Sequence, residues 1–210
     1  MQPINRRLSK LLTPFLASWG LTPNKVTLLG LAAGLFCAWN FLRGTASGWM
    51  LGALWFQLAY VLDNCDGDLA RMTGRSSGFG SWLDVVTDCI IHMAFFLSLG
   101  VGLHRFGAGS FWLWLGIATA GAVFFTYVAY LFQQVSHRGQ EAWIHPDPPG
   151  GQDTSTWWGK FRKFSREDFS LIVLVSAVLH QMGWLLISGL MGALVIVVVT
   201  MISALERIRA

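Results

Sequence analysis

The chain has 210 residues, of which 54% are hydrophobic and only 12% are charged, about half the charged share of an ordinary soluble domain. With a mean hydropathy of +0.52, it has too little polar surface for a soluble globular enzyme and too many apolar residues for disorder. The class that remains is an all-α membrane protein that crosses the bilayer several times. The net charge of +4 fits basic loops beside an anionic leaflet, so we expect no nucleic-acid partner.

Residues 1–20 predict a short amphipathic helix that lies on the membrane surface, separate from a membrane domain at 21–210. Basic side chains (Arg6, Arg7 and Lys10) fall on one side of this helix, where they would face lipid phosphates. A mobile tail is the alternative interpretation. Apolar side chains recur at helical spacing on the other side. They are Ile4, Leu8, Leu11, Leu12, Phe15, Leu16 and Trp19.

Six hydrophobic segments follow, and we expect each to be a transmembrane helix, since about 20 apolar residues cross a bilayer core. The second reaches that length only if it continues to about Arg71. The stretch 169–205 contains no Asp, Glu, Lys or Arg and is too long for one span. We therefore divide it at His180, Gln181 and Gly183. The predicted spans are 26–42, 49–62, 82–103, 111–132, 169–181 and 184–205.

The distribution of lysine and arginine indicates that both ends of the chain are cytoplasmic. Only Arg43 and Arg105 fall in the predicted outer loops. By the positive-inside rule, we expect a multi-pass protein of the bacterial or archaeal cytoplasmic membrane. The predicted cytoplasmic residues are Arg6, Arg7, Lys10, Lys25, Arg71, Arg75, Arg138, Lys160, Arg162, Lys163, Arg166, Arg207 and Arg209.

Carboxylates are concentrated in the second and third predicted spans, although ionised groups near hydrocarbon are costly and therefore indicate a functional site. Asp63 and Asp66 share one face of the second span. Asp84 and Asp88 share one face of the third. The two spans are expected to be antiparallel neighbours. The rise of a helix then places all four carboxylates at one level, just inside the cytoplasmic boundary.

Four carboxylates this close need countercharge, which a divalent cation provides. Ligation by oxygen alone favours Mg²⁺, Mn²⁺ or Ca²⁺ over zinc, and two ions about 4 Å apart would suit displacement at phosphorus. Two other interpretations remain: a structural cluster paired with Arg71 and Arg75, and an ion or proton transporter. Transporter sites lie nearer the bilayer midplane, whereas this cluster is expected to open to the cytoplasm.

The residues between the carboxylates suit a phosphate ligand. Gly67 lets a ligand approach the backbone, and Ala70 leaves room for a flat group between helices. Arg71 can form paired hydrogen bonds with a diphosphate. Gly80 allows close approach beside the N-terminus of the third span, whose dipole favours an anion.

Residues 63–88 read D-N-C-D-G-D-L-A-R, eight residues, G, three residues, D, three residues, D. This run resembles, at every fixed position, the CDP-alcohol phosphotransferase signature D-x2-D-G-x2-A-R-x8-G-x3-D-x3-D. The run Thr22-Pro23-Asn24-Lys25-Val26-Thr27 is similar to that family's start of its first helix. The resemblance covers about 20–105 well, and the C-terminal half resembles the family in architecture only.

The resemblance implies a phospholipid-synthesising enzyme that moves a substituted phosphate group from a CDP-linked donor to a hydroxyl of an acceptor alcohol and releases CMP. It implies that Asp63, Asp66 and Asp84 hold Mg²⁺ or Mn²⁺, with two ions expected. Asp88 would be the general base and could also touch the second ion. Asp68 is not a fixed position, so we assign it no chemistry. The residues implied to line the CDP site are Gly67, Ala70, Arg71 and Gly80.

The resemblance further implies a homodimer among membrane lipids, with CDP-diacylglycerol or a similar CDP-alcohol as donor. The acceptor stays open between a phosphorylated polyol, such as inositol phosphate or glycerol phosphate, and serine, choline or another polyol. Some relatives join soluble CDP-polyols, and a catalytically silent scaffold is a further alternative. Arg138 and Arg166 bracket a long basic loop from the ends of two predicted spans. They are therefore candidates to bind an acceptor phosphate, unless they serve only as membrane anchors.

Overall fold

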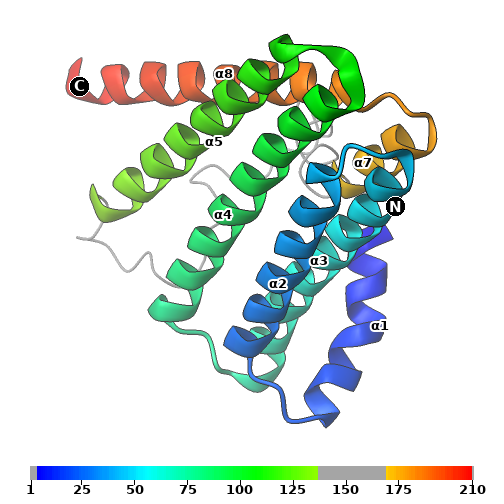
Figure 1. Ribbon diagram of the computed structural model, residues 1–210. Helices are drawn as coiled ribbons and strands as arrows, with labels where there is room; N and C mark the ends of the chain where they lie inside the picture. Colours follow the sequence, from blue (N-terminus) through cyan, green and yellow to red (C-terminus); the bar gives the residue numbers. More distant parts are fainter. Residues whose placement is uncertain (1–3, 137–168, 210) are drawn as a thin grey trace.

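The computed structural model describes residues 4–136 and 169–209, and every regular element in these ranges is helical (Figure 1). The predicted all-α fold is confirmed, and each of the six predicted spans overlaps one helix. In chain order, the helices are α1 (Ile4–Ser18), α2 (Pro23–Leu42), α3 (Ala46–Thr73), α4 (Gly78–Leu103), a π-helical turn η1 (His104–Ala108), α5 (Ser110–Ser136), α7 (Phe169–Val178) and α8 (Met182–Arg209).

Apolar surface on the outside of the bundle identifies an integral membrane protein. Among the described residues, three segments are long and apolar enough to cross a bilayer, namely Pro23–Leu42, Gly78–Ala108 and Ser110–Leu131. α3 is as long, but its second half carries the aspartates. α7 and the apolar part of α8 are shorter, and the count of six spans stays a prediction. Trp39 and Trp114 are each 67% exposed, as lipid-facing side chains would be.

The predicted break near residue 180 is confirmed. α7 ends at Val178, and α8 begins at Met182. His180 between them has a left-handed φ of 55°, a conformation that an α-helix does not accommodate. In Figure 1, α8 runs across the end of the bundle that lies opposite the α3–α4 loop.

The short loop between α3 and α4 determines where the carboxylates meet. α3 ends at Thr73, and the next residue, Gly74, adopts a left-handed φ of 63°, as glycines that terminate helices commonly do. α4 begins after Ser77, whose side chain accepts a hydrogen bond from the N–H of Gly80 at 3.0 Å. The two helices are therefore antiparallel, and their aspartates lie at the loop end of the bundle.

α2 contacts both carboxylate-bearing helices extensively, and α3 and α4 face each other mainly through side chains. The rings of Phe56 on α3 and Phe95 on α4 stack with centroids 4.5 Å apart. Gly34 of α2 lies against Ile91 of α4, where an added Cβ would approach within 2.5 Å. α3 and α4 were predicted to be antiparallel neighbours. They meet through side chains such as these rings, and α2 packs against both of them.

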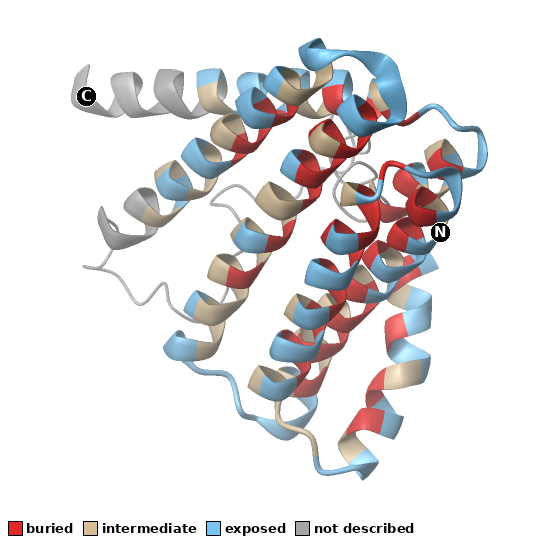
Figure 2. Ribbon diagram, viewed as in Figure 1, coloured by how far each residue is buried: buried red, intermediate tan, exposed pale blue. Residues whose placement is uncertain are grey.

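Two clusters of buried apolar residues stabilise this arrangement, and Figure 2 shows buried positions gathered where α2 and α3 face each other. The first cluster surrounds Phe41, Phe56 and Phe95 and extends to Met182 and Leu186 of α8. The second joins α1, α2 and α3 near the aspartates. It contains Leu16, Val26, Ala33, Ala59, Val61, Leu62, Cys65 and Leu69.

α1 packs along α3 through a mainly polar face. Asn5 accepts a hydrogen bond from the side chain of Gln57 and donates one to Ser170 Oγ at 2.8 Å. The apolar residues Leu11 and Trp19 are 78% and 67% exposed. The amphipathic helix is therefore present, with small polar residues toward the protein and apolar residues outward. Its placement on the membrane surface stays a prediction. The buried residues of α1 are Asn5, Ser9, Thr13 and Leu16.

Candidate active site

The structure brings together three of the four aspartates that the sequence singles out. One carboxylate oxygen from each of Asp63, Asp66 and Asp84 lies within 4.8 Å of the other two. Asp66 is only 7% exposed, and Asp63 and Asp84 are half-buried. Asp88, one turn further along α4 and also half-buried, is not a member of this group.

The donor set of this carboxylate group suits a divalent cation. Three acidic oxygens at such separations repel one another unless a cation or proton compensates them. Oδ1 of Asp84 is buried without a hydrogen-bond partner, so it offers a free acceptor. Arg71 pairs with Asp68, with Nη2 and Oδ1 2.6 Å apart, and not with the three clustered aspartates. In the part of the chain that the structure describes, no ion pair joins Arg71 or Arg75 to the three clustered aspartates, so the alternative of a structural cluster paired with these two arginines is not supported.

Thr27 of α2 orients one of these carboxylates. Its hydroxyl lies 2.6 Å from Asp66 Oδ2 and 3.1 Å from the carbonyl oxygen of Pro23, so the shorter bond goes to the aspartate. No spacing rule connects these two residues, since Thr27 and Asp66 are 39 positions apart in the chain.

We predict that Thr27→Val weakens binding of a divalent cation by roughly ten- to a hundredfold, because outer groups that hydrogen-bond a metal ligand typically contribute that much. Calorimetric titration with Mn²⁺ measures the change. Thr119→Val is the matched control, since Thr119 is buried and its hydroxyl donates to the Leu115 carbonyl of its own helix, away from the carboxylate group. Equal Mn²⁺ affinity in Thr27→Val and the wild type would show that Thr27 does not orient the site.

The residues predicted to line a nucleotide site lie beside the carboxylate group. A Cβ added at Gly67 would lie 3.5 Å from both terminal nitrogens of Arg71, so the guanidinium folds back over this glycine. A Cβ at Gly80 would lie 3.1 Å from Asn24 Oδ1 and from Ser77 Oγ. A larger residue there would crowd the junction of α2 and α4. Ala70 is half-buried.

A half-buried polar cluster lies one turn beyond Asp88 on α4. His92 Nδ1 is 2.8 Å from the Asp88 carbonyl oxygen, so this nitrogen carries the proton and donates to it. His92 Nε2 is then the acceptor for Tyr60 Oη at 3.1 Å. Tyr127 Oη lies 3.2 Å from Nδ1. His92 thus contacts the backbone of Asp88 and not its carboxylate, as a packed polar residue.

Sequence reasoning missed the two tyrosines, although a signal existed. The chain has only three tyrosines, and Tyr60 precedes Asp63 by three positions, on the same face of α3. Tyr127 lies on α5, far away in sequence, so no spacing rule connects it to His92. Arg138 and Arg166 fall outside the described residues.

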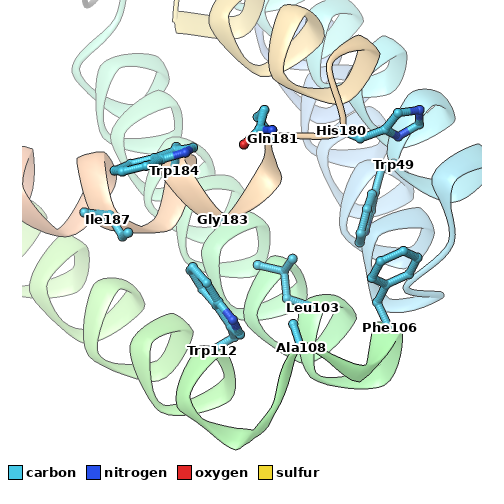
Figure 3. Close-up of a pocket in the computed structure, with 10 residues that line it drawn as sticks. All are labelled: Trp49, Leu103, Phe106, Ala108, Trp112, His180, Gln181, Gly183, Trp184 and Ile187. Atoms are coloured by element: carbon cyan, nitrogen blue, oxygen red, sulfur yellow. The ribbon is translucent and has the colours of Figure 1, made fainter.

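A separate cavity of about 410 Å³ lies at the opposite end of the bundle (Figure 3). Trp49 near the start of α3 and Leu103 at the end of α4 line it, whereas the aspartates lie toward the other ends of these helices. It is therefore distinct from the carboxylate group. Its remaining lining residues are Phe106, Ala108, Trp112, His180, Gln181, Gly183, Trp184 and Ile187.

Comparison with known proteins connects this site to one family. Residues 20–202 match the family described as CDP-alcohol phosphatidyltransferase. The chain is 33% identical over 124 residues to the bifunctional IPC transferase and DIPP synthase of Aquifex aeolicus, covering 59% of this chain and 27% of that protein. It is 32% identical over 123 residues to the phosphatidylinositol phosphate synthase of Cutibacterium acnes, covering 58% of this chain and 57% of that protein.

A third relative, the archaetidylinositol phosphate synthase of Pyrococcus horikoshii, is 32% identical over 87 residues, which cover 41% of this chain and 45% of that protein. The chain thus matches less than two thirds of the length of each of these relatives. The family match extends over most of the chain and includes α2, α3 and α4, which carry the aspartates, Thr27 and Arg71. The chain therefore belongs to the CDP-alcohol phosphatidyltransferase family.

Proposed function

We propose that this protein is a membrane-embedded transferase that moves a substituted phosphate group from a CDP-linked donor to the hydroxyl of an acceptor alcohol, with release of CMP. The observation that carries the proposal is the carboxylate group of Asp63, Asp66 and Asp84, formed by the same signature that identifies the family. CDP-diacylglycerol is the proposed donor, because a site in membrane-embedded helices is accessible to a lipid substrate, and the reaction would belong to phospholipid biosynthesis.

The family uses divalent metals, and we propose that these three aspartates hold two ions, Mg²⁺ or Mn²⁺. When bound, such ions offset the charge that develops on phosphoryl and leaving-group oxygens. Asp66 is held in place by Thr27. Gly67 and Gly80 keep the approach to the phosphates open, and the exposed guanidinium of Arg71 is available to hydrogen-bond the diphosphate.

Asp88 is the proposed general base. The acceptor oxygen attacks the phosphorus distal to cytidine and forms the new phosphodiester bond. The bond from that phosphorus to the bridging oxygen breaks, and CMP leaves with the electron pair. The carboxylate of Asp88 takes the proton of the acceptor hydroxyl. The hydrogen bond from His92 to the Asp88 carbonyl connects this turn of α4 to the half-buried tyrosines Tyr60 and Tyr127 and so restricts movement of the base.

An inositol phosphate is the proposed acceptor, because the names of two relatives specify phosphatidylinositol phosphate and archaetidylinositol phosphate synthases. The test is release of CMP from CDP-diacylglycerol by purified protein with Mg²⁺ or Mn²⁺ and a panel of acceptors. The panel contains inositol phosphate, glycerol phosphate, serine and choline. Turnover with serine or choline alone would rule out the phosphorylated acceptor while leaving the transferase reaction intact.

Arg138 and Arg166 are the proposed acceptor-phosphate ligands. A charge-assisted hydrogen bond from arginine to phosphate is worth roughly 1.5–3 kcal/mol. We therefore expect Arg138→Ala and Arg166→Ala to raise the acceptor KM about ten- to a hundredfold and to leave the donor KM nearly unchanged. Steady-state kinetics with each substrate varied in turn measures both constants. A change in the donor KM alone would assign these arginines to the donor site, and no change would leave them as membrane anchors.

We propose that the carboxylate site opens to the cytoplasm, with η1 on the opposite side of the membrane. A cysteine at position 107 should then react with an impermeant maleimide only from the outside of intact cells. A cysteine at position 150 should react only after the cytoplasmic face is exposed. Reaction of both from the same side would contradict this orientation.

A further inference from the structure

We propose that Asp68 positions the Arg71 guanidinium for the CDP diphosphate and that Ser9 of the N-terminal helix α1 holds Asp68 for this task. The inference rests on the proposed function. It assigns a role to a residue outside the fixed signature positions, and it gives α1 a part in donor binding in addition to any contact with the membrane.

The two oxygens of Asp68 have different partners. Oδ1 accepts a hydrogen bond from Arg71 Nη2 at 2.6 Å. Oδ2 lies 3.2 Å from Ser9 Oγ. The Asp68 side chain is 16% exposed, whereas that of Arg71 is 56% exposed. Asp68 therefore lies between the buried Ser9 hydroxyl on α1 and the exposed Arg71 guanidinium on α3.

The contact with Asp68 determines where the arginine points. A long exposed arginine side chain otherwise loses considerable rotamer entropy when it is fixed by a ligand. Here the guanidinium is already folded back over Gly67, with both terminal nitrogens 3.5 Å from the position of a Cβ on that glycine. Asp68 uses one N–H of the five that a guanidinium carries. The others are left for the phosphates beside the carboxylate group.

α1 supplies a rigid support for Asp68. Ser9 is fully buried, and its hydroxyl proton is shared between Asp68 Oδ2 and the Arg6 carbonyl oxygen, both at 3.2 Å. The Ser9 carbonyl oxygen in turn lies 3.7 Å from Cys65 Sγ. Asn5 accepts a hydrogen bond from Gln57 of α3 and donates one to Ser170 of α7, and these bonds keep the polar face of α1 against the bundle. Movement of α1 would therefore release Asp68.

A competing effect has the opposite sign. The negative charge of Asp68 also weakens the attraction of Arg71 for a diphosphate, so removing it could strengthen donor binding. We expect positioning to outweigh this repulsion. Asp68 contacts only one nitrogen of the Arg71 guanidinium, so the two phosphates of CDP still meet a positively charged group that is already held beside the site. The sign of the change in donor affinity therefore distinguishes the two possibilities.

The test is the affinity of the full-length protein in detergent for CDP, in the presence of Mg²⁺, by calorimetry. Asp68→Ala is expected to raise the Kd for CDP about tenfold, the loss associated with one charge-assisted hydrogen bond. Asp68→Asn can still accept from Arg71 and donate to Ser9, so a change of only a few-fold is expected. Ser9→Ala should raise the Kd a few-fold. Ser18→Ala is its matched control on α1, because Ser18 Oγ bonds the Phe15 carbonyl of its own helix.

The combination with Arg71→Ala separates positioning from a general loss of structure. Asp68→Ala should change CDP affinity in the wild type and have no further effect when Arg71 is already alanine. The same loss in both backgrounds, or tighter binding by Asp68→Ala, would overturn the inference. If Asp68→Ala does not fold, the Kd values of Asp68→Asn and Ser9→Ala for CDP provide the test instead. A wild-type protein that does not bind CDP would instead overturn the proposed donor site.

Discussion

Asparagine in place of Asp63, Asp66 or Asp84 is expected to lower metal-dependent CMP release roughly a thousandfold, the upper range for losing one preorganised electrostatic group. Asparagine preserves the size of the side chain but removes a charged ligand from a group whose oxygens lie within 4.8 Å of one another. Initial rates of CMP release at saturating Mn²⁺ measure the effect. A lower affinity for Mn²⁺ should accompany it.

Glu206→Gln is the control for the loss of one carboxylate, because Glu206 lies on α8, outside the helices that carry the site, and it should retain wild-type rates. Chelation of the wild type should reproduce the effect of the aspartate variants, and added Mn²⁺ should reverse it. Near-normal activity in one of the three variants would remove that aspartate from the metal site.

Asp88→Asn is expected to lower kcat by about a hundredfold to ten-thousandfold, the range for loss of a general base, while CDP and Mn²⁺ still bind. The expectation follows from the position of Asp88, one turn along α4 and outside the group of three carboxylates. An asparagine there can still accept hydrogen bonds but cannot take the proton of the acceptor hydroxyl.

Metal titration separates this role from direct ligation. The Mn²⁺ concentration that gives half-maximal activity should be unchanged in Asp88→Asn, whereas it should rise in Asp84→Asn. A parallel rise in both variants would make Asp88 a metal ligand in addition to, or in place of, a base. A kcat equal to that of the wild type would transfer the role of base to another group.

The part of the site that lies along single helices could be predicted from sequence. Spacings of three and four residues placed Asp63 with Asp66 and Asp84 with Asp88 on shared faces, and a short glycine-containing loop made α3 and α4 antiparallel. The break near His180 was also predictable, since His180 and its neighbours are the polar interruption in a long apolar run, whereas the exact helix ends at Val178 and Met182 were not.

Contacts between helices distant in sequence could not be predicted in this way. The hydroxyl of Thr27 reaches Asp66 from α2, and Tyr127 reaches His92 from α5, at separations that no periodicity encodes. α1 shows the same limit. Its amphipathic pattern was visible, but only the structure shows that Ser9 faces Asp68, because a small buried polar residue and an exposed one have the same signature in a sequence.

The most direct test of the central claim is a reaction of purified protein with CDP-diacylglycerol and inositol phosphate, in which CMP and the lipid product are both quantified by mass spectrometry. Our account predicts equal amounts of CMP and phosphodiester product, formed with Mg²⁺ or Mn²⁺ and abolished by chelation or by Asp66→Asn. Ion flux through protein-containing liposomes with no CMP release from any CDP-linked donor, or CMP release that persists after chelation, would contradict it.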